Sequence, residues 1–314
     1  MRNIILKVHK IFYGYNNKHY KTRNYITKII CNIMSRFCDV TLNLYLKIYG
    51  KLGLYPSPLK EENDIIVSLT SFPKRIDSLW MVIDSMFHQT IRPSKIFLYL
   101  SKEEFPKGKE SLPKRLLNYE NLGLNICFRD ENLMPHNKYY YALQEHCKTN
   151  VITIDDDLYY HKNLISNLWH LHKKFPNCVC SNTIDIIQFE KNGNFKPYKQ
   201  WTRPIDKQAP SILNLALGYN GVLYPSNIYK SIEVFNKLKI RELSLKADDL
   251  WLKIHQVREQ IPVVTGDHFC TGVSILGTQA QSLMASNCGN NENDSQWNNL
   301  CKYYNINKDS FYNI

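Results

Sequence analysis

Residues 64–276 alternate between short apolar runs and longer segments in which apolar positions have helical spacing. Four of the runs are rich in β-branched and aliphatic residues, which is typical of buried strands. They span 65–69, 95–100, 124–128 and 151–154. Apolar positions at helical spacing follow in 77–88 and in 139–147. Because strands that alternate with helices form parallel sheets, we predict an α/β fold with a mostly parallel central sheet flanked by helices.

The second half of this region has shorter elements. One helix is predicted over 163–175, and another opens at Ala247 and runs to Val257. Strands are predicted over 178–181, 185–189, 196–201 and 262–264, with a hairpin turn at 191–194 and a glycine-marked loop and strand over 218–224. The tail over 277–314 is rich in Asn, Ser and Gln, and we expect it to be irregular.

The N-terminal residues 1–52 form a basic segment with helical periodicity. They hold ten of the chain's 40 Lys and Arg residues and one acid, Asp39, so that they contribute +9 to the net charge of +12. The apolar positions with helical spacing are Ile4, Ile5, Val8, Ile11, Phe12, Tyr25, Ile26, Ile29, Ile30, Ile33, Met34 and Phe37. The pattern predicts a basic amphipathic helical extension. Three alternatives follow for this extension: it binds an anionic membrane surface, it packs on the body of the protein or on a second subunit, or it is disordered. Residues 53–63 follow as a linker.

Charge and cysteine content exclude several classes of protein. Without residues 1–52 the net charge is only +3, which is too little for strong nucleic-acid binding. The nine cysteines are scattered and include no CxxC pair, which argues against a disulfide framework or a thiolate zinc site and for a reducing compartment. The sequence contains no apolar run of about 18 residues. It also has no continuous apolar core of a signal peptide, so we expect a cytoplasmic location.

Motifs of several enzyme classes are absent from the sequence. It has no GxGxxG motif and no Walker lysine, which are the phosphate-binding motifs of dinucleotide-dependent oxidoreductases and of P-loop enzymes. These two classes are therefore not favoured. It has no GxSxG elbow, which a hydrolase of that type would need. The chemistry must therefore come from other polar clusters.

Three consecutive carboxylates, of Asp155, Asp156 and Asp157, follow the predicted strand 151–154. Like charges this close raise one another's pKa unless a cation compensates them. A hard divalent cation with oxygen ligands removes that cost and can also hold a diphosphate. The triplet therefore predicts a metal-diphosphate site at a strand end, and the alternative is a solvated acidic turn.

These segments together resemble GT-A-fold glycosyltransferases, most of all the bacterial family-2-like enzymes that build surface polysaccharides. The resemblance extends over about residues 64–270 and rests on 65–72, 85–89, 93–98, 154–157 and 247–251. It implies a GT-A fold and transfer of a sugar from a nucleotide-diphosphate sugar to a glycan or lipid-linked acceptor. The N-terminal fifty residues and the tail lie outside it.

In that family the first strand and the loop after it hold the nucleotide. The resemblance implies a donor-binding role for Ser68, Leu69, Thr70, Ser71 and Arg75. An alternative role for Thr70 and Ser71 is to cap the next helix. Both roles are compatible, because a helix N-terminus also favours anions.

The triplet resembles the family's DxD motif. This implies that Asp157 is a direct metal ligand, that Asp155 contacts the metal or the ribose, and that Asp156 belongs to the donor site. The ion would be Mn²⁺ or Mg²⁺, bridging the diphosphate and stabilising the charge on the leaving group. Some metal-dependent relatives supply a histidine as a third ligand, and His268 is the candidate; its alternative is a structural role.

Asp248 and Asp249 form the second carboxylate site, at a predicted helix start. An inverting transfer needs a base near the acceptor hydroxyl. The resemblance implies that this base is Asp249, with Asp248 as the second choice. The alternative is that Asp248 is an N-cap and Asp249 only complements the helix dipole. Lys138 and Gly221 are further donor-binding candidates, through the phosphates and through close approach of the backbone to the sugar.

Three hypotheses remain at this point. The chain is an inverting metal-dependent glycosyltransferase of surface polysaccharide synthesis, or a retaining enzyme of the same fold. Alternatively it is a catalytically silent nucleotide-sugar-binding or scaffold protein of a membrane-associated assembly. With the basic extension, we expect a cytoplasmic protein that binds peripherally to the inner face of the cell membrane.

Overall fold

The computed structural model describes residues 1–18, 25–204, 206–267, 272–278 and 291–312. Within these residues, eight strands form one sheet in the order β3-β2-β1-β4-β10-β6-β11-β8. They are β1 (Ile65–Thr70), β2 (Lys95–Ser101), β3 (Leu124–Arg129), β4 (Asn150–Thr153), β6 (Val179–Ser181), β8 (Gln208–Ser211), β10 (Val222–Tyr224) and β11 (Val263–Thr265). Two small pairs lie outside it: β5 (Leu158–Tyr159) with β12 (Val273–Ser274), and β7 (Ile184–Ile186) with β9 (Asn214–Ala216).

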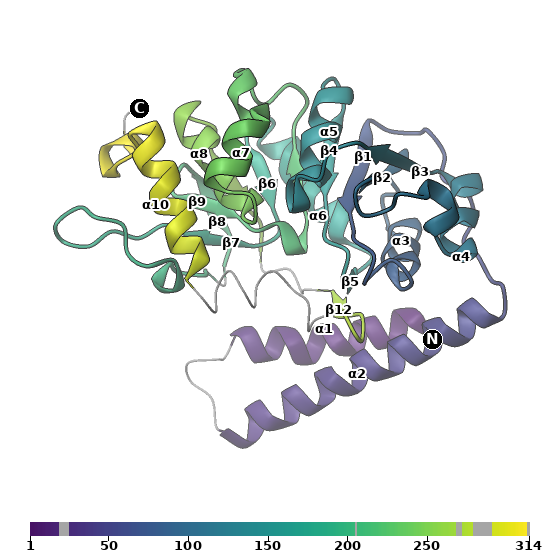
Figure 1. The fold of residues 1–314 in the computed structure, drawn as a ribbon. Coiled ribbons are helices and arrows are strands. Elements are labelled where there is room, and N and C mark those ends of the chain that lie inside the picture. Colours follow the sequence, from purple (N-terminus) through teal and green to yellow (C-terminus); the bar gives the residue numbers. More distant parts are fainter. Residues whose placement is uncertain (19–24, 205, 268–271, 279–290, 313–314) are drawn as a thin grey trace.

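Most neighbouring strands of the large sheet run parallel. β1 pairs in parallel with β2 and β4, β2 with β3, and β6 with β11. β10 lies between β4 and β6 and is antiparallel to both, and β8 is antiparallel to β11 at the edge. The predicted α/β class, with a mostly parallel central sheet flanked by helices and an N-terminal helical extension, is confirmed (Figure 1).

The sheet is buried on both faces, because its strands point alternate side chains into two cores. Ile65, Val67 and Leu69 of β1 belong to one core, whereas Ile66 belongs to the other. The first core is covered by α3 (Leu79–Phe87), α4 (Lys114–Leu117) and α6 (Leu164–Lys174), and the second by α5 (Asn137–Glu145), α7 (Lys237–Leu243) and α8 (Asp248–Arg258). Burial on both faces explains why 65–69 is an almost unbroken apolar run.

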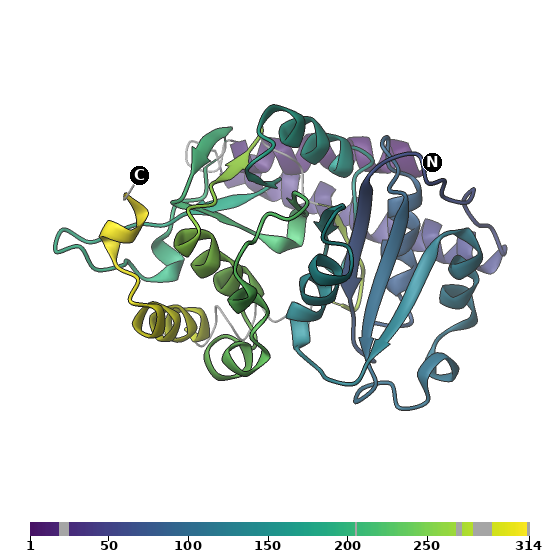
Figure 2. The same ribbon diagram turned by 90° about the horizontal axis from the view of Figure 1, so that it is seen from above.

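The N-terminal extension is a helical hairpin that lies along one side of the body (Figures 1 and 2). Its helices are α1 (Arg2–Lys18) and α2 (Tyr25–Lys51). Arg2 lies 3.1 Å from the buried carboxylate of Asp84 in α3. The Asn43 side chain donates to Ser274 O at 2.8 Å and accepts from Leu276 N at 3.0 Å. One side of the extension therefore packs on the body.

No helix in the described ranges is long and apolar enough to cross a membrane.

The segment around the predicted hairpin turn differs in part from expectation. The turn at 191–194 is present, since Glu190 N donates to Asn194 O at 2.8 Å and Phe189 bridges Phe195. However, residues 196–201 do not form the predicted strand and instead contain a short 3-10 helix, Tyr198–Gln200.

The tail also differs from the irregular structure that its composition predicts. Helix α10 spans Glu292–Tyr304 and buries Trp297, Leu300 and Cys301 in the second core. These positions have helical spacing, but the polar residues around them dominate the composition. Packing against α8 and α7 thus overrides a weak local preference.

Candidate functional site

The aspartate triplet follows β4 and is held on one side by the loop after β1. Arg75 donates through Nη1 to Asp156, and its Nη2 lies 3.4 Å from Asp157 Oδ2. Ser71 also donates to Asp156, at 2.6 Å. These bonds turn Asp156 inward, to a side chain only 8% exposed, and fix the triplet against the end of β1.

Lys138, in the first turn of α5, holds the other side of the triplet. Its Nζ lies 2.6 Å from Asp155 Oδ1 and 3.0 Å from Asp248 Oδ2. The buried hydroxyl of Ser68 donates to the backbone carbonyl of Lys138 and so ties this helix start to β1. One buried ammonium therefore joins the two carboxylate sites that the sequence places far apart.

The second carboxylate pair occupies the first turn of α8. The helix begins at Asp248, and its N-cap is Ala247, so the alternative role of Asp248 as an N-cap is wrong. Asp249 accepts from the backbone N–H of Gly218 with both oxygens, at 3.2 and 3.1 Å. A Cβ on Gly218 would lie 3.0 Å from Lys138 Nζ and 3.1 Å from Asp249 Oδ1. Because Gly218 has no side chain, Lys138 Nζ and the Asp249 carboxylate can both lie against it.

The combined site has an excess of negative charge. It contains five carboxyl groups, those of Asp155–Asp157 and Asp248–Asp249, and only two cationic side chains, Arg75 and Lys138. Both cations are nearly buried, at 7% and 6% side-chain exposure, so water screens these charges only weakly. The site is therefore suited to bind further positive charge.

The electrostatics divide the aspartate pair into two different acids. Burial, together with the charges of Asp248 and Asp155, raises the pKa of Asp249 well above its usual range. Burial also opposes ionisation of Asp248, but the ammonium of Lys138 outweighs it and lowers the pKa of Asp248. Neighbouring carboxyl groups with separated pKa values are typical of acid-base sites. Asp249 is therefore the weaker acid of the pair and keeps its proton to higher pH than Asp248 does.

The residues fit a hard divalent cation in donor type and in charge. The donors are all carboxylate oxygens, which Mg²⁺ and Mn²⁺ accept. Asp155 and Asp157 keep side-chain exposures of 32% and 15%, whereas Asp156 is committed to Arg75 and Ser71. Within the described ranges no three His, Cys, Asp or Glu side chains stand in ligating positions. The candidate His268 lies outside the described residues.

Other expected donor-binding residues have different surroundings. Leu69 is fully buried in the first core, and the hydroxyl of Thr70 donates to Tyr99 O at 2.8 Å. Neither Thr70 nor Ser71 caps the next helix, because the N-cap of α3 is Ser78. Gly221 has φ +86, a conformation that favours glycine, and a Cβ there would meet the side chain of Leu164. Local backbone and packing requirements thus account for this glycine.

Tyr160 is a site residue that the sequence did not reveal. Its hydroxyl accepts from the backbone N–H of Asp155 at 2.9 Å and lies 3.1 Å from Tyr219 O. It therefore joins the triplet to the loop that carries Gly218. Its only sequence signal is its position shortly after the triplet.

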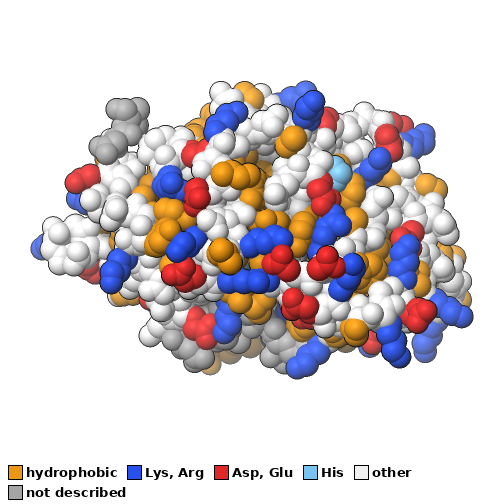
Figure 3. Space-filling model, turned by 45° about the horizontal axis from the view of Figure 1, so that its top comes forward, with side chains coloured by type: hydrophobic (Ala, Val, Ile, Leu, Met, Phe, Trp, Pro, Cys, Tyr) orange, Lys and Arg blue, Asp and Glu red, His pale blue; other side chains and the backbone are white. Residues whose placement is uncertain are grey.

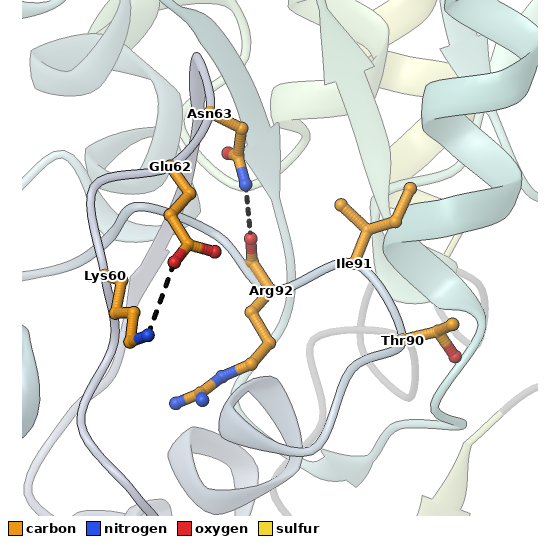
Figure 4. Close-up of a pocket in the computed structure, with 6 residues that line it drawn as sticks. All are labelled: Lys60, Glu62, Asn63, Thr90, Ile91 and Arg92. Carbon is orange, nitrogen blue, oxygen red and sulfur yellow. Dashed lines mark hydrogen bonds and ion pairs between the residues drawn. The ribbon is translucent and has the colours of Figure 1, made fainter.

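A separate pocket of about 300 Å³ lies at the opposite end of the strands (Figure 4). It is lined by Lys60, Glu62, Asn63, Thr90, Ile91 and Arg92. Asn63 donates to Arg92 O at 2.7 Å, and Lys60 pairs with Glu62 at 3.5 Å. These residues precede β1 and β2, whereas the carboxylates follow β4, so the pocket is not part of the carboxylate site.

Comparison with known proteins finds no matching family model and no matching curated protein. Among solved structures, S. aureus TarS 1–349 is 14% identical, with a TM-score of 0.41, over 65% of this chain and 60% of that one. The mannosyltransferase PcManGT from Pyrobaculum calidifontis, in complex with GDP-Man and Mn²⁺, is 13% identical, with a TM-score of 0.41, over 80% and 69%.

A third structure is CMP:2-keto-3-deoxy-manno-octonic acid synthetase in complex with CTP. It is 8% identical, with a TM-score of 0.41, over 74% of this chain and 100% of that one. The chain thus spans 60% of the length of the TarS fragment. Likenesses of this extent identify neither a family nor an activity.

Proposed function

We propose that this chain is a metal-dependent GT-A glycosyltransferase that uses a nucleotide-diphosphate sugar. One observation carries the proposal: Lys138 joins Asp155, after β4, to Asp248, at the start of α8. A diphosphate with its cation and a proton-accepting carboxylate are the two parts that such a transfer needs. In this proposal the triplet would hold the cation with the diphosphate, the second pair would supply the proton acceptor, and Lys138 keeps the two side by side.

Each residue of the site has a separate proposed role. Arg75 and Ser71 hold Asp156, which leaves Asp155 and Asp157 to bind Mn²⁺ or Mg²⁺. When bound, the ion would neutralise the diphosphate and stabilise the leaving group. Lys138 keeps Asp248 ionised and orients Asp155.

Asp249 is the proposed base that takes the proton from the acceptor hydroxyl. Its raised pKa makes it a stronger base than an ordinary carboxylate. A carboxylate base in line with the departing diphosphate corresponds to inversion at the sugar. The proposed acceptor is a glycan or a lipid-linked glycan of surface polysaccharide synthesis, with the reaction on the cytoplasmic side of the membrane.

A thermal-shift panel of nucleotide sugars, with and without Mn²⁺, tests the proposal. A donor at about 100 times its Kd adds about 2.7 kcal/mol to the free energy of unfolding, so one sugar nucleotide should raise Tm by several degrees. The shift should require Mn²⁺ and be lost in Asp157→Asn. No shift with any sugar nucleotide would contradict the proposal. Binding without release of nucleoside diphosphate would support a silent binding or scaffold protein instead.

Gly218→Ala is expected to lower kcat/KM for the donor at least tenfold with little change in Tm. The added Cβ would lie 3.0 Å from Lys138 Nζ and 3.1 Å from Asp249 Oδ1, so it would displace the groups that position the chemistry. Gly266→Ala is the matched control, because a Cβ there has no neighbour within 4 Å. Steady-state kinetics and melting curves of both variants measure the effect. Equal kinetics for the two variants would contradict this role for Gly218.

A further inference from the structure

The outer side of the N-terminal hairpin carries an unusual number of exposed apolar side chains. We define them as the apolar stripe: Met1, which precedes α1, Ile4 and Ile11 on α1, and Ile26, Ile29, Ile30, Ile33, Phe37, Val40, Leu44 and Ile48 on α2. On α2 they recur every three or four residues and so lie along one side of the helix. Phe37 is 62% and Ile33 is 60% exposed. A contiguous stripe of this kind marks an interaction surface.

The opposite side of α2 already has its partner. Cys38, Leu42 and Leu46 are buried in the first core, and Asn43 bonds to the segment around β12. Arg2 fixes the start of α1 to Asp84 of α3. The apolar stripe therefore cannot turn inward without breaking these contacts.

The charges beside the stripe are all positive. Arg36, Lys47 and Lys51 are exposed on α2, each three residues after a stripe residue, and Lys7 and Lys10 are exposed on α1. The one acid of residues 1–52, Asp39, is buried, and burial raises its pKa to about 6. By contrast, the face shown in Figure 3 carries acidic and basic side chains intermixed.

We propose that the apolar stripe is a docking surface for an anionic lipid bilayer. The hairpin would lie in the headgroup region with the stripe toward the acyl chains and its lysines and arginines on the lipid phosphates. A second copy of this chain fits less well. Paired helices use charges of opposite sign beside the seam, and here both copies would present basic side chains with no exposed acid among the described residues of the hairpin.

Co-sedimentation of the full chain with vesicles tests the docking surface. The protein should bind phosphatidylcholine vesicles that contain phosphatidylglycerol, and bind pure phosphatidylcholine vesicles much more weakly. Ile33→Asp/Phe37→Asp should reduce binding at least tenfold, because it places two charges in the apolar interface. Ile232→Asp/Leu238→Asp is the control. Both of its positions are 76% exposed and lie outside the hairpin, so its binding should stay at the parent level.

A second pair of variants separates charge from apolar contact. Arg36→Gln/Lys47→Gln should weaken binding to anionic vesicles roughly tenfold, whereas Lys191→Gln/Lys207→Gln, with the same loss of charge elsewhere, should not. Circular dichroism should show all variants folded. Parent-level binding by both hairpin variants, or no binding by the parent chain, would overturn the proposal. A dimer in light scattering that Ile33→Asp/Phe37→Asp dissociates would also overturn it, because the stripe would then join two copies.

Discussion

Asp249→Asn is expected to lower kcat for sugar transfer by about 10²–10⁴-fold, the usual contribution of a general base. The variant keeps the shape of the side chain and can still accept from Gly218 N, but it cannot take a proton. In the parent, log kcat/KM should rise with pH through the raised pKa of Asp249 and then level off. This rise should be absent in the variant. Initial rates of nucleoside diphosphate release over a pH series measure both effects.

The same substitution should make the ligand-free protein more stable at neutral pH. Because the folded-state pKa of Asp249 lies above the unfolded value, the folded chain keeps a proton that the unfolded chain has lost. This group's contribution to stability therefore falls as pH rises between the two pKa values. Asn has no ionisable group and so removes this loss of stability. We expect the free energy of unfolding to rise by about 1 kcal/mol, which raises Tm by about 2–4 °C. Asp206→Asn, at an exposed carboxylate, should change neither rate nor Tm; an inactive and unfolded Asp249→Asn would contradict both expectations.

Arg75→Met is expected to destabilise the protein by about 3–5 kcal/mol, which lowers Tm by roughly 10 °C. The guanidinium is the partner of Asp156 and a neighbour of Asp157, and methionine would leave the buried carboxyl group of Asp156 without its counter-ion. The matched control is Arg241→Met. Its ion pair with Glu131, at 2.9 Å, is exposed and should contribute less than about 1 kcal/mol. Urea unfolding of both variants gives the comparison.

A double substitution separates the ion pair from general damage at this position. Asp156→Asn removes the charge that Arg75→Met leaves unpaired, so Arg75→Met/Asp156→Asn should recover at least half of the lost stability. Asn can still accept from Ser71. If the losses in free energy of unfolding of Arg75→Met and Asp156→Asn simply added in the double variant, the buried ion pair would not be the source of the destabilisation.

Much of the fold was predictable because buried parallel strands have a strong local signal. The apolar runs at 65–69 and 95–100 correspond to β1 and β2. Burial on both faces leaves few polar positions in them, with Ser68 inside the first run and Lys95 at the start of the second. The insertion of β10 between β4 and β6 was not predictable, because strand order depends on long-range packing. Helix α10 was missed for the same reason: its partners, α8 and α7, lie far away in the sequence.

The charged residues of the site were predictable, but the pairing of its cations with its acids was not. Consecutive aspartates after a strand and at a helix start are visible as sequence patterns. That Lys138 bridges Asp155 and Asp248 is not, because residues from three separate elements meet there. The partners of Asp156 were not predictable for a similar reason, since Arg75 and Ser71 come from the loop after β1. Side-chain pairing across elements is the information that a local pattern lacks.

The most direct test of the proposed function is release of nucleoside diphosphate from the donor by three proteins: the parent chain, Asp157→Asn and Asp249→Asn. With Mn²⁺ and an acceptor glycan, we predict turnover by the parent, loss of turnover when a chelator removes the metal, and a loss of at least 100-fold in both variants. Parent-level rates in both variants would contradict the central claim that the two carboxylate sites carry the reaction.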